Sequence, residues 1–201
     1  MSNVFIINGH QPYPSSPGKL NASLVERAHR YFEAEGCYTR LTKVAQGYDP
    51  EREVSNHQWA DVVIMQFPVN WMGVPWLFKK YIDQVYSAGS NGRLYNGDGR
   101  TSEAPKANYG TGGALAGTKY MLSVTFNAPR EAFNDPEQPL FQGLSVDDLL
   151  LPMHLNARFF SMEKTANICG VRRQKKILKL TVTLRASTRI YARSFRVVLA
   201  L

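Results

Sequence analysis

A segment directly after the first apolar run carries the groups that hold phosphate in proteins. Residues 9–19 contain two glycines, two serines and a lysine, and Asn21 follows. A glycine-bearing loop that opens a helix offers its backbone N–H groups to an anion. Two familiar phosphate loops are excluded, because eight residues separate Gly9 from Gly18 and Leu20, rather than Ser or Thr, follows the lysine. The segment therefore predicts a phosphate site of a different kind.

Two further segments carry flat aromatic surface next to polar groups. Val69–Gly73 holds an indole and a thioether, and Thr125–Ala128 holds a phenyl ring between hydroxyl and amide groups. Phosphate-binding groups in one loop and planar surface in the others describe a flavin nucleotide better than a sugar or a metal ion. The residues alone leave an alternative open, in which Trp71 and Trp76 are core residues and residues 13–17 only form turns.

The three segments follow apolar runs that predict strands buried in a parallel sheet. Between the runs, apolar residues recur at helical spacing; Ser23 and Glu26 have the spacing of a capping box, and Gly36 suits a helix end. This order is typical of an α/β fold with a doubly wound parallel sheet. Ligands bind such sheets beyond the carboxyl ends of the strands, so we expect the three segments to converge on one site. We expect strands at Val4–Ile7, Cys37–Val44, Asp61–Gln66, Lys119–Phe126 and Leu149–Pro152, and helices at residues 20–35, 50–58 and 76–86.

Composition narrows the class of protein. The 201 residues, 44% of them hydrophobic, are enough for one α/β domain. No apolar stretch approaches the roughly 18 residues of a membrane span, and residues 1–3 lack the basic segment of an export signal. Cys37 and Cys169 lie far apart without metal-ligand spacing, which fits a reducing compartment. We expect a cytoplasmic protein.

Seven motifs together resemble one family. They are FIING at 5–9, WADVVI at 59–64, WMGVPW at 71–76, KKYID at 79–83, DGRT at 98–101, YGTGG at 109–113 and TFNAP at 125–129. In this order they resemble the modulator of drug activity B family of flavodoxin-like NAD(P)H:quinone oxidoreductases, relatives of DT-diaphorase. The likeness runs in register over about the first 163 residues, up to FSME at 160–163.

The resemblance implies a flavodoxin-like sheet of five parallel strands and a homodimer that binds FAD. It implies two-electron, ping-pong hydride transfer from NADPH or NADH through FAD to a quinone, with no metal. Because the chemistry belongs to the cofactor, the only candidates for a catalytic side chain are Tyr109 and His154, and we favour a structural role for His154. The implied FAD contacts are Ser16, Pro17, Gly18, Lys19, Leu20, Asn21, Ala22, Ser23, Val69, Asn70, Trp71, Met72, Tyr109, Thr125, Phe126, Asn127 and Ala128.

Two details bear on these implications. Val69-Asn70 replaces the glycine and tryptophan of some family members, which predicts a smaller stacking surface for the ring. A non-enzymatic, flavodoxin-type electron carrier is the alternative function. The aromatic segment at Trp71, the long glycine-rich connection at residues 88–117 and a body that is not strongly acidic favour an enzyme with a substrate pocket.

The last 38 residues differ from the rest. All 16 acidic residues precede Lys164, whereas ten of the 24 Lys and Arg residues lie from Lys164 onward, so this tail accounts for the formal charge of +8. Residues 178–184 alternate apolar and polar, a strand pattern where the family has a helix. A basic arm for nucleic acid or an anionic membrane is one interpretation. We favour the other, a reading-frame shift near codon 164, and therefore predict a domain at residues 1–163, an atypical tail at 164–201 and no nucleic-acid partner.

Overall fold

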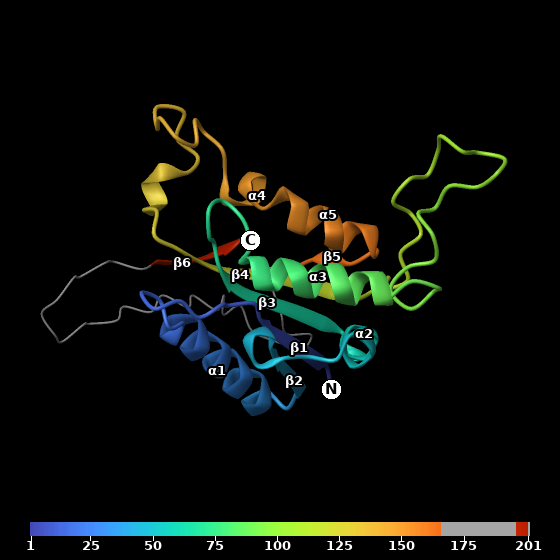
Figure 1. Ribbon diagram of the computed structural model, residues 1–201, viewed down its shortest axis with the longest axis horizontal. Coiled ribbons are helices and arrows are strands. Elements are labelled where there is room, and N and C mark those ends of the chain that lie inside the picture. Colours follow the sequence, from blue (N-terminus) through green and yellow to red (C-terminus); the bar gives the residue numbers. More distant parts are fainter. Residues whose placement is uncertain (166–195, 201) are drawn as a thin grey trace, which may run out of the picture.

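The computed structural model describes residues 1–165 and 196–200. Five parallel strands form a sheet in the order β2-β1-β3-β4-β5, and β6 pairs antiparallel with β4 (Figure 1). This confirms the predicted flavodoxin-like α/β fold. The elements are β1 (Asn3–Asn8), α1 (Lys19–Ala34), β2 (Tyr38–Lys43), η1 (Val44–Gln46), α2 (Pro50–Trp59), β3 (Val62–Pro68), α3 (Trp76–Ala88), β4 (Lys119–Phe126), η2 (Arg130–Ala132), α4 (Val146–Leu149), α5 (Leu151–Phe159), β5 (Glu163–Lys164) and β6 (Arg196–Ala200).

The central strands are apolar on both faces because helices cover both sides of the sheet. Alternate residues of β1 point to opposite faces. Val4 and Ile6 pack with Val25 of α1, whereas Phe5 and Ile7 belong to a larger cluster with α2, α3 and α5. Figure 1 shows α1 on one side of the sheet and α3, α4 and α5 on the other. The strand register then fixes where the three following loops lie.

The predicted strand at Leu149–Pro152 is wrong. The segment joins two helices, α4 and α5, and the fifth strand is Glu163–Lys164 instead. Ser145 and Asp148 form a reciprocal capping box that starts α4, and Pro152 lies in the first turn of α5, where a missing N–H costs nothing. The leucine run therefore belongs to a helix pair, in which Leu150 is buried and Leu151 is exposed, and a run this short does not distinguish a helix from a strand.

The capping box expected at Ser23 and Glu26 is also wrong. Helix α1 begins earlier, with Gly18 as its N-cap residue. The Ser23 hydroxyl donates to the carbonyl of Lys19 inside the helix, and Glu26 pairs with Arg30. Gly36 has a positive φ of 76° just past the helix end, as expected for a glycine in that position.

The tail is described only in part. The alternation at residues 178–184 lies outside the described residues, and the domain boundary near residue 163 stays a prediction. β5 pairs with β4 over two residues, and β6 then pairs with Leu122–Phe126 of the same strand. Among the described residues, no helix combines the length and apolar character needed to cross a membrane.

Candidate functional site

The loops after β1, β3 and β4 meet at the carboxyl edge of the sheet. Asn8, the last residue of β1, aligns with Gln66, and Gln66 aligns with Ser123, so the three strands end within about three residues of one another. The loops are also bonded to their neighbours: the Gly9 N–H donates to the Gln66 carbonyl (2.8 Å) and the Val69 N–H to the Thr125 carbonyl (2.9 Å). The predicted segments 16–23, 69–72 and 125–128 are therefore brought together.

The start of α1 is an uncapped helix N-terminus. Gly18 is the N-cap residue in the left-handed conformation (φ 80°), no side chain caps the helix, and its first turn holds no acidic residue. The first N–H groups of an α-helix have no partner within the helix and carry partial positive charge. This 16-residue helix thus points N–H groups at the edge where the loops meet, as an anion site requires.

His10 lies directly against this helix start. A Cβ built on Gly18 would lie 2.2 Å from the imidazole of His10, so only glycine leaves room for the ring. His10 is 7% exposed, and its buried Nε2 has no hydrogen-bond partner among the described residues; the same holds for Oε1 of Gln11. Burial lowers the pKa of His10, while a hydrogen bond to the Ser16 backbone raises it. A buried nitrogen without a partner, beside a helix N-terminus, suits an anionic ligand.

A buried polar network connects the phosphate end with the ring end. Gln66 donates from Nε2 to Oδ1 of Asn21 (2.8 Å) and accepts at Oε1 from the hydroxyl of Ser123 (2.6 Å). Asn21 in turn donates from Nδ2 to the hydroxyl of Thr125 (3.3 Å). The network joins α1, β3 and β4. The Asn21 side chain is thereby engaged inside the protein, so its contribution to phosphate binding is limited to its backbone N–H.

The loop after β3 is a tight turn with bulky residues in an unfavourable conformation. Asn70 and Gly73 pair with each other, while Trp71 (φ 47°) and Met72 (φ 66°) occupy the two central positions. Glycine and asparagine normally take such positions, and strain of this kind is concentrated at functional sites. The turn holds the Trp71 side chain 98% exposed and leaves Met72 half-exposed. An exposed aromatic surface is thus fixed at the site edge.

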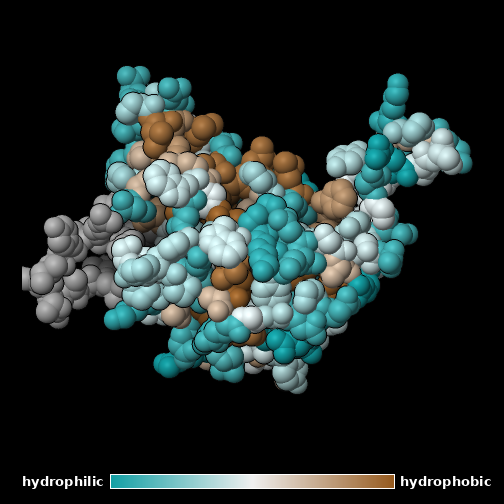
Figure 2. Space-filling model, in the orientation of Figure 1, coloured by the Kyte–Doolittle hydropathy of each residue, from teal (hydrophilic) through white to brown (hydrophobic). Residues whose placement is uncertain are grey.

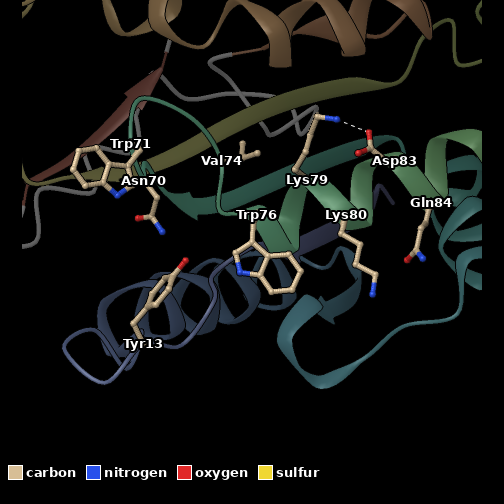
Figure 3. A pocket seen from close by; sticks show the side chains of 9 residues that line it. All are labelled: Tyr13, Asn70, Trp71, Val74, Trp76, Lys79, Lys80, Asp83 and Gln84. Carbon is tan, nitrogen blue, oxygen red and sulfur yellow. Dashed lines mark hydrogen bonds and ion pairs between the residues drawn. The ribbon is translucent and has the colours of Figure 1, made fainter.

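A groove of about 620 Å³ runs from this turn along the outer face of α3. Figure 3 shows Trp71 and Tyr13 near one end, Trp76 in the middle and Gln84 at the other. The lining residues are Tyr13, Asn70, Trp71, Val74, Trp76, Lys79, Lys80, Asp83 and Gln84. Tyr13 comes from the phosphate loop, so the groove borders both parts of the site.

The remaining predicted FAD contacts differ in their exposure to solvent. Ser16, Pro17, Lys19 and Asn127 are exposed at the site edge. Phe126 is buried and its ring contacts that of Phe133, so only its backbone faces a ligand. Asn127 and Ala128 follow Phe126 at the start of the loop after β4. Among the described residues, no cluster of His, Cys, Asp and Glu side chains is arranged to hold a metal ion.

Tyr109 and His154 do not join the other predicted residues. Tyr109 lies on the long connection between α3 and β4, which extends away from the body in Figure 1. It is 71% exposed, 5.5 Å below the Arg100 guanidinium, and its ring centroid lies 6.2 Å from that of Phe159 at the end of α5. This places it toward the amino edge of the sheet, where β4 and β5 begin.

His154 is a structural residue of the same amino edge. Its Nδ1 bonds the hydroxyl of Tyr120 (2.9 Å), and its Nε2 bonds Asp147 (3.2 Å), which also pairs with Lys164. Burial lowers the pKa of His154; Asp147 raises it in part. Both nitrogens are therefore used to join α4, α5 and β4, and the catalytic role considered for His154 is not supported by its position.

Sequence reasoning missed His10 and Gln66. A signal for His10 existed, since it follows directly on the Asn8-Gly9 strand end where a ligand-binding loop begins. Gln66 was overlooked because it lies within an apolar run. A buried glutamine at the carboxyl end of a strand is a signal in itself, because both of its amide atoms need hydrogen-bond partners.

Comparison with known proteins extends this picture. A family described by a flavodoxin-like fold matches residues 2–178. The NADPH:quinone oxidoreductase MdaB of Haemophilus influenzae is 41% identical over 162 residues, 81% of this chain and 83% of that protein. A putative quinone reductase of Klebsiella pneumoniae (TM-score 0.63, 24% identity) aligns over 82% of this chain and 73% of its own. General stress protein 14 of Treponema denticola, solved with FMN, has a TM-score of 0.58 at 21% identity and covers 82% of this chain and 83% of its own.

Proposed function

The chain belongs to the flavodoxin-like family that includes NAD(P)H:quinone oxidoreductases, and on that premise we propose that it binds FAD and reduces quinones with NADPH. The observation that carries the proposal is the meeting of three features at one edge of the sheet: an uncapped helix N-terminus, a buried histidine whose Nε2 has no partner among the described residues, and a fixed aromatic turn. An electron carrier and a quinone reductase differ in whether a substrate molecule can approach the flavin ring. The groove that opens beside Trp71 favours the enzyme.

The residues present fit a flavin nucleotide. The first N–H groups of α1 and Nε2 of His10 would donate to phosphate oxygens, which would satisfy the hydrogen-bond deficit of that buried ring. The turn at residues 70–73 and the backbone of residues 125–128 would hold the flavin ring. When bound, the flavin supplies the group that exchanges a hydride with the nicotinamide and two electrons with the quinone.

We propose FAD rather than FMN because the loop offers two separate places for phosphate donors. The helix N-terminus offers one set, and Nε2 of His10 offers a second donor in the same loop. Two phosphate groups, as in FAD, use both sets, whereas a single phosphate uses one. The FMN-bound relative shows that the fold accommodates the smaller cofactor. The loop after β1, and not the sheet, would therefore distinguish FAD from FMN.

A homodimer gives Tyr109 a place at the site. The residue is exposed and lies away from the strand ends of its own chain, so contact with a flavin requires a second copy. Apolar side chains on α5, Leu151 and Leu155, are also exposed, and Figure 2 shows hydrophobic surface gathered over α4 and α5. We propose that the long connection at residues 88–117 of one copy, which carries Tyr109, reaches the ring site of another. Sedimentation of the purified protein with and without FAD tests this proposal; a monomer at micromolar concentration in both states overturns it.

The proposed activity is tested by reconstitution. Protein stripped of flavin is loaded with FAD or FMN, and NADPH oxidation is followed with menadione as acceptor. We expect stoichiometric yellow FAD complex and sustained turnover. Flavin-loaded protein without turnover would overturn the quinone reductase and support the electron carrier. Failure to bind any flavin would overturn both functions.

We propose that the functional unit ends near Glu163 and that the flavin and quinone sites need no residue of the tail. The identity to the Haemophilus protein covers 162 residues, and the family model matches no further than residue 178. The nucleotide sequence around codon 164, translated in three frames, tests the frame shift. Salt-sensitive DNA binding that is lost on truncation after Glu163 would instead support a basic arm.

A further inference from the structure

The groove along α3 extends beyond the loops that flank the flavin ring. It begins at Asn70 and Trp71 and continues past Trp76 to Lys80 and Gln84 on successive turns of the helix (Figure 3). Helical residues four apart lie on one face, so the Trp76 and Lys80 side chains emerge about 6 Å apart along the axis. The indole of Trp76 is 60% exposed. A ligand that touches the ring site at Trp71 can therefore continue along α3.

The charges of the groove are not balanced. The Lys79 ammonium pairs with Asp83 at 2.5 Å, and Gln84 accepts a hydrogen bond from the Tyr48 hydroxyl at 2.6 Å. Lys80 is exposed and makes no ion pair or hydrogen bond with any side chain in the described part of the chain. The groove thus joins a flat indole surface to one unpaired positive charge, a combination that suits a nucleotide base and a phosphate.

We propose that this groove binds the adenosine 2′-phosphate half of NADPH, with the adenine on Trp76 and the 2′-phosphate paired with Lys80. The inference rests on the proposed function and deepens it, because it makes Lys80 the residue that distinguishes NADPH from NADH. The nicotinamide end then lies toward Trp71, next to the ring site. The adenosine of FAD is the other ligand with similar chemistry, but it lacks the 2′-phosphate that Lys80 would bind.

The central test replaces Lys80 and measures binding without turnover. FAD-loaded protein is titrated calorimetrically with adenosine 2′,5′-bisphosphate and, separately, with AMP. An exposed ion pair with a phosphate contributes modestly, so we expect Lys80→Ala to weaken bisphosphate binding about fivefold to tenfold and AMP binding less than twofold. Equal weakening of both ligands, or of neither, overturns the proposal.

Kinetics and two control variants complete the test. With menadione as acceptor, Lys80→Ala should raise the KM for NADPH by a similar factor and shift the KM for NADH less than twofold. Lys119→Ala removes an exposed lysine at the opposite edge of the sheet, and Lys79→Ala removes one already paired with Asp83; both should have smaller effects on NADPH. A fall in FAD affinity in Lys80→Ala would assign the groove to FAD. Absence of turnover with either nucleotide would overturn the proposed function, while the calorimetric result would still decide the groove.

Discussion

Two buried histidines lie at opposite edges of the same sheet, and burial lowers the pKa of both. At the amino edge, His154 uses both ring nitrogens to join Tyr120 and Asp147. At the carboxyl edge, His10 has an Nε2 that no described residue satisfies. One edge has its hydrogen bonds complete, and the other has a deficit that a ligand can fill. The comparison separates a residue that holds the fold from one available for binding, although both are histidines in similar burial.

A third histidine shows which part of this comparison matters. His57 also has a buried Nε2 to which no residue in the described part of the chain bonds, but its ring lies edge-on against Phe5 and Tyr86 in the closed core between α2 and the sheet. An unsatisfied nitrogen is therefore not sufficient evidence for a site. It becomes evidence at His10 because a helix N-terminus and a ligand-facing loop lie beside it.

The largest expected effect comes from closing the space that His10 occupies. Gly18→Ala places a methyl group 2.2 Å from the imidazole, at a residue with φ 80°, so the ring and the helix start must move. We expect flavin affinity to fall at least about 100-fold, measured by fluorescence titration of flavin-free protein. Gly36→Ala is the matched control, since Gly36 has φ 76° but nothing within 4 Å of its Cβ position. Equal losses in the two variants would show that backbone strain alone is responsible.

Replacing the buried histidine of each edge by alanine gives the next largest effect. His10→Ala should weaken flavin binding about tenfold or more, because a charge-assisted bond to phosphate is lost, with little change in the stability of flavin-free protein. His154→Ala should do the reverse: it leaves the buried Tyr120 hydroxyl without its partner and removes one of the two contacts of Asp147, which costs about 1–3 kcal/mol and lowers Tm by several degrees. If His154→Ala weakened flavin binding as much as His10→Ala, the distinction between the edges would be lost.

The smallest effect is a pH dependence of stability that His57 dominates. Burial lowers the pKa of His57 to about 4 from an ordinary 6.5, so below pH 6.5 the unfolded chain binds a proton that the folded chain does not. The free energy of unfolding should fall by about 1 kcal/mol per pH unit as pH drops from 6.5 toward 4. Urea unfolding at several pH values measures this slope, and His57→Gln should flatten it. An unchanged slope would mean that other groups dominate acid unfolding.

Four of the five parallel strands and the meeting of three loops could be predicted because apolar runs such as Val4–Ile7 are buried on both faces of the sheet. The helix pair at residues 146–159 could not, since a short leucine run fits a strand as well as a helix. The site was predicted as segments but not as side chains. Asn21 was expected to face phosphate, whereas its amide bonds Gln66 and Thr125, a contact that depends on three elements distant in sequence.

The turn at residues 70–73 gives the protein its own optical probe. Trp71 is fully solvated at the tip of a fixed turn beside the ring site, whereas Trp59 lies under the Arg40 guanidinium, 4.1 Å from its ring. The emission of Trp71 should therefore be the most red-shifted and the most easily quenched by acrylamide. A ligand that covers the turn would dim and blue-shift that component, so occupancy of this edge can be followed in the unlabelled molecule.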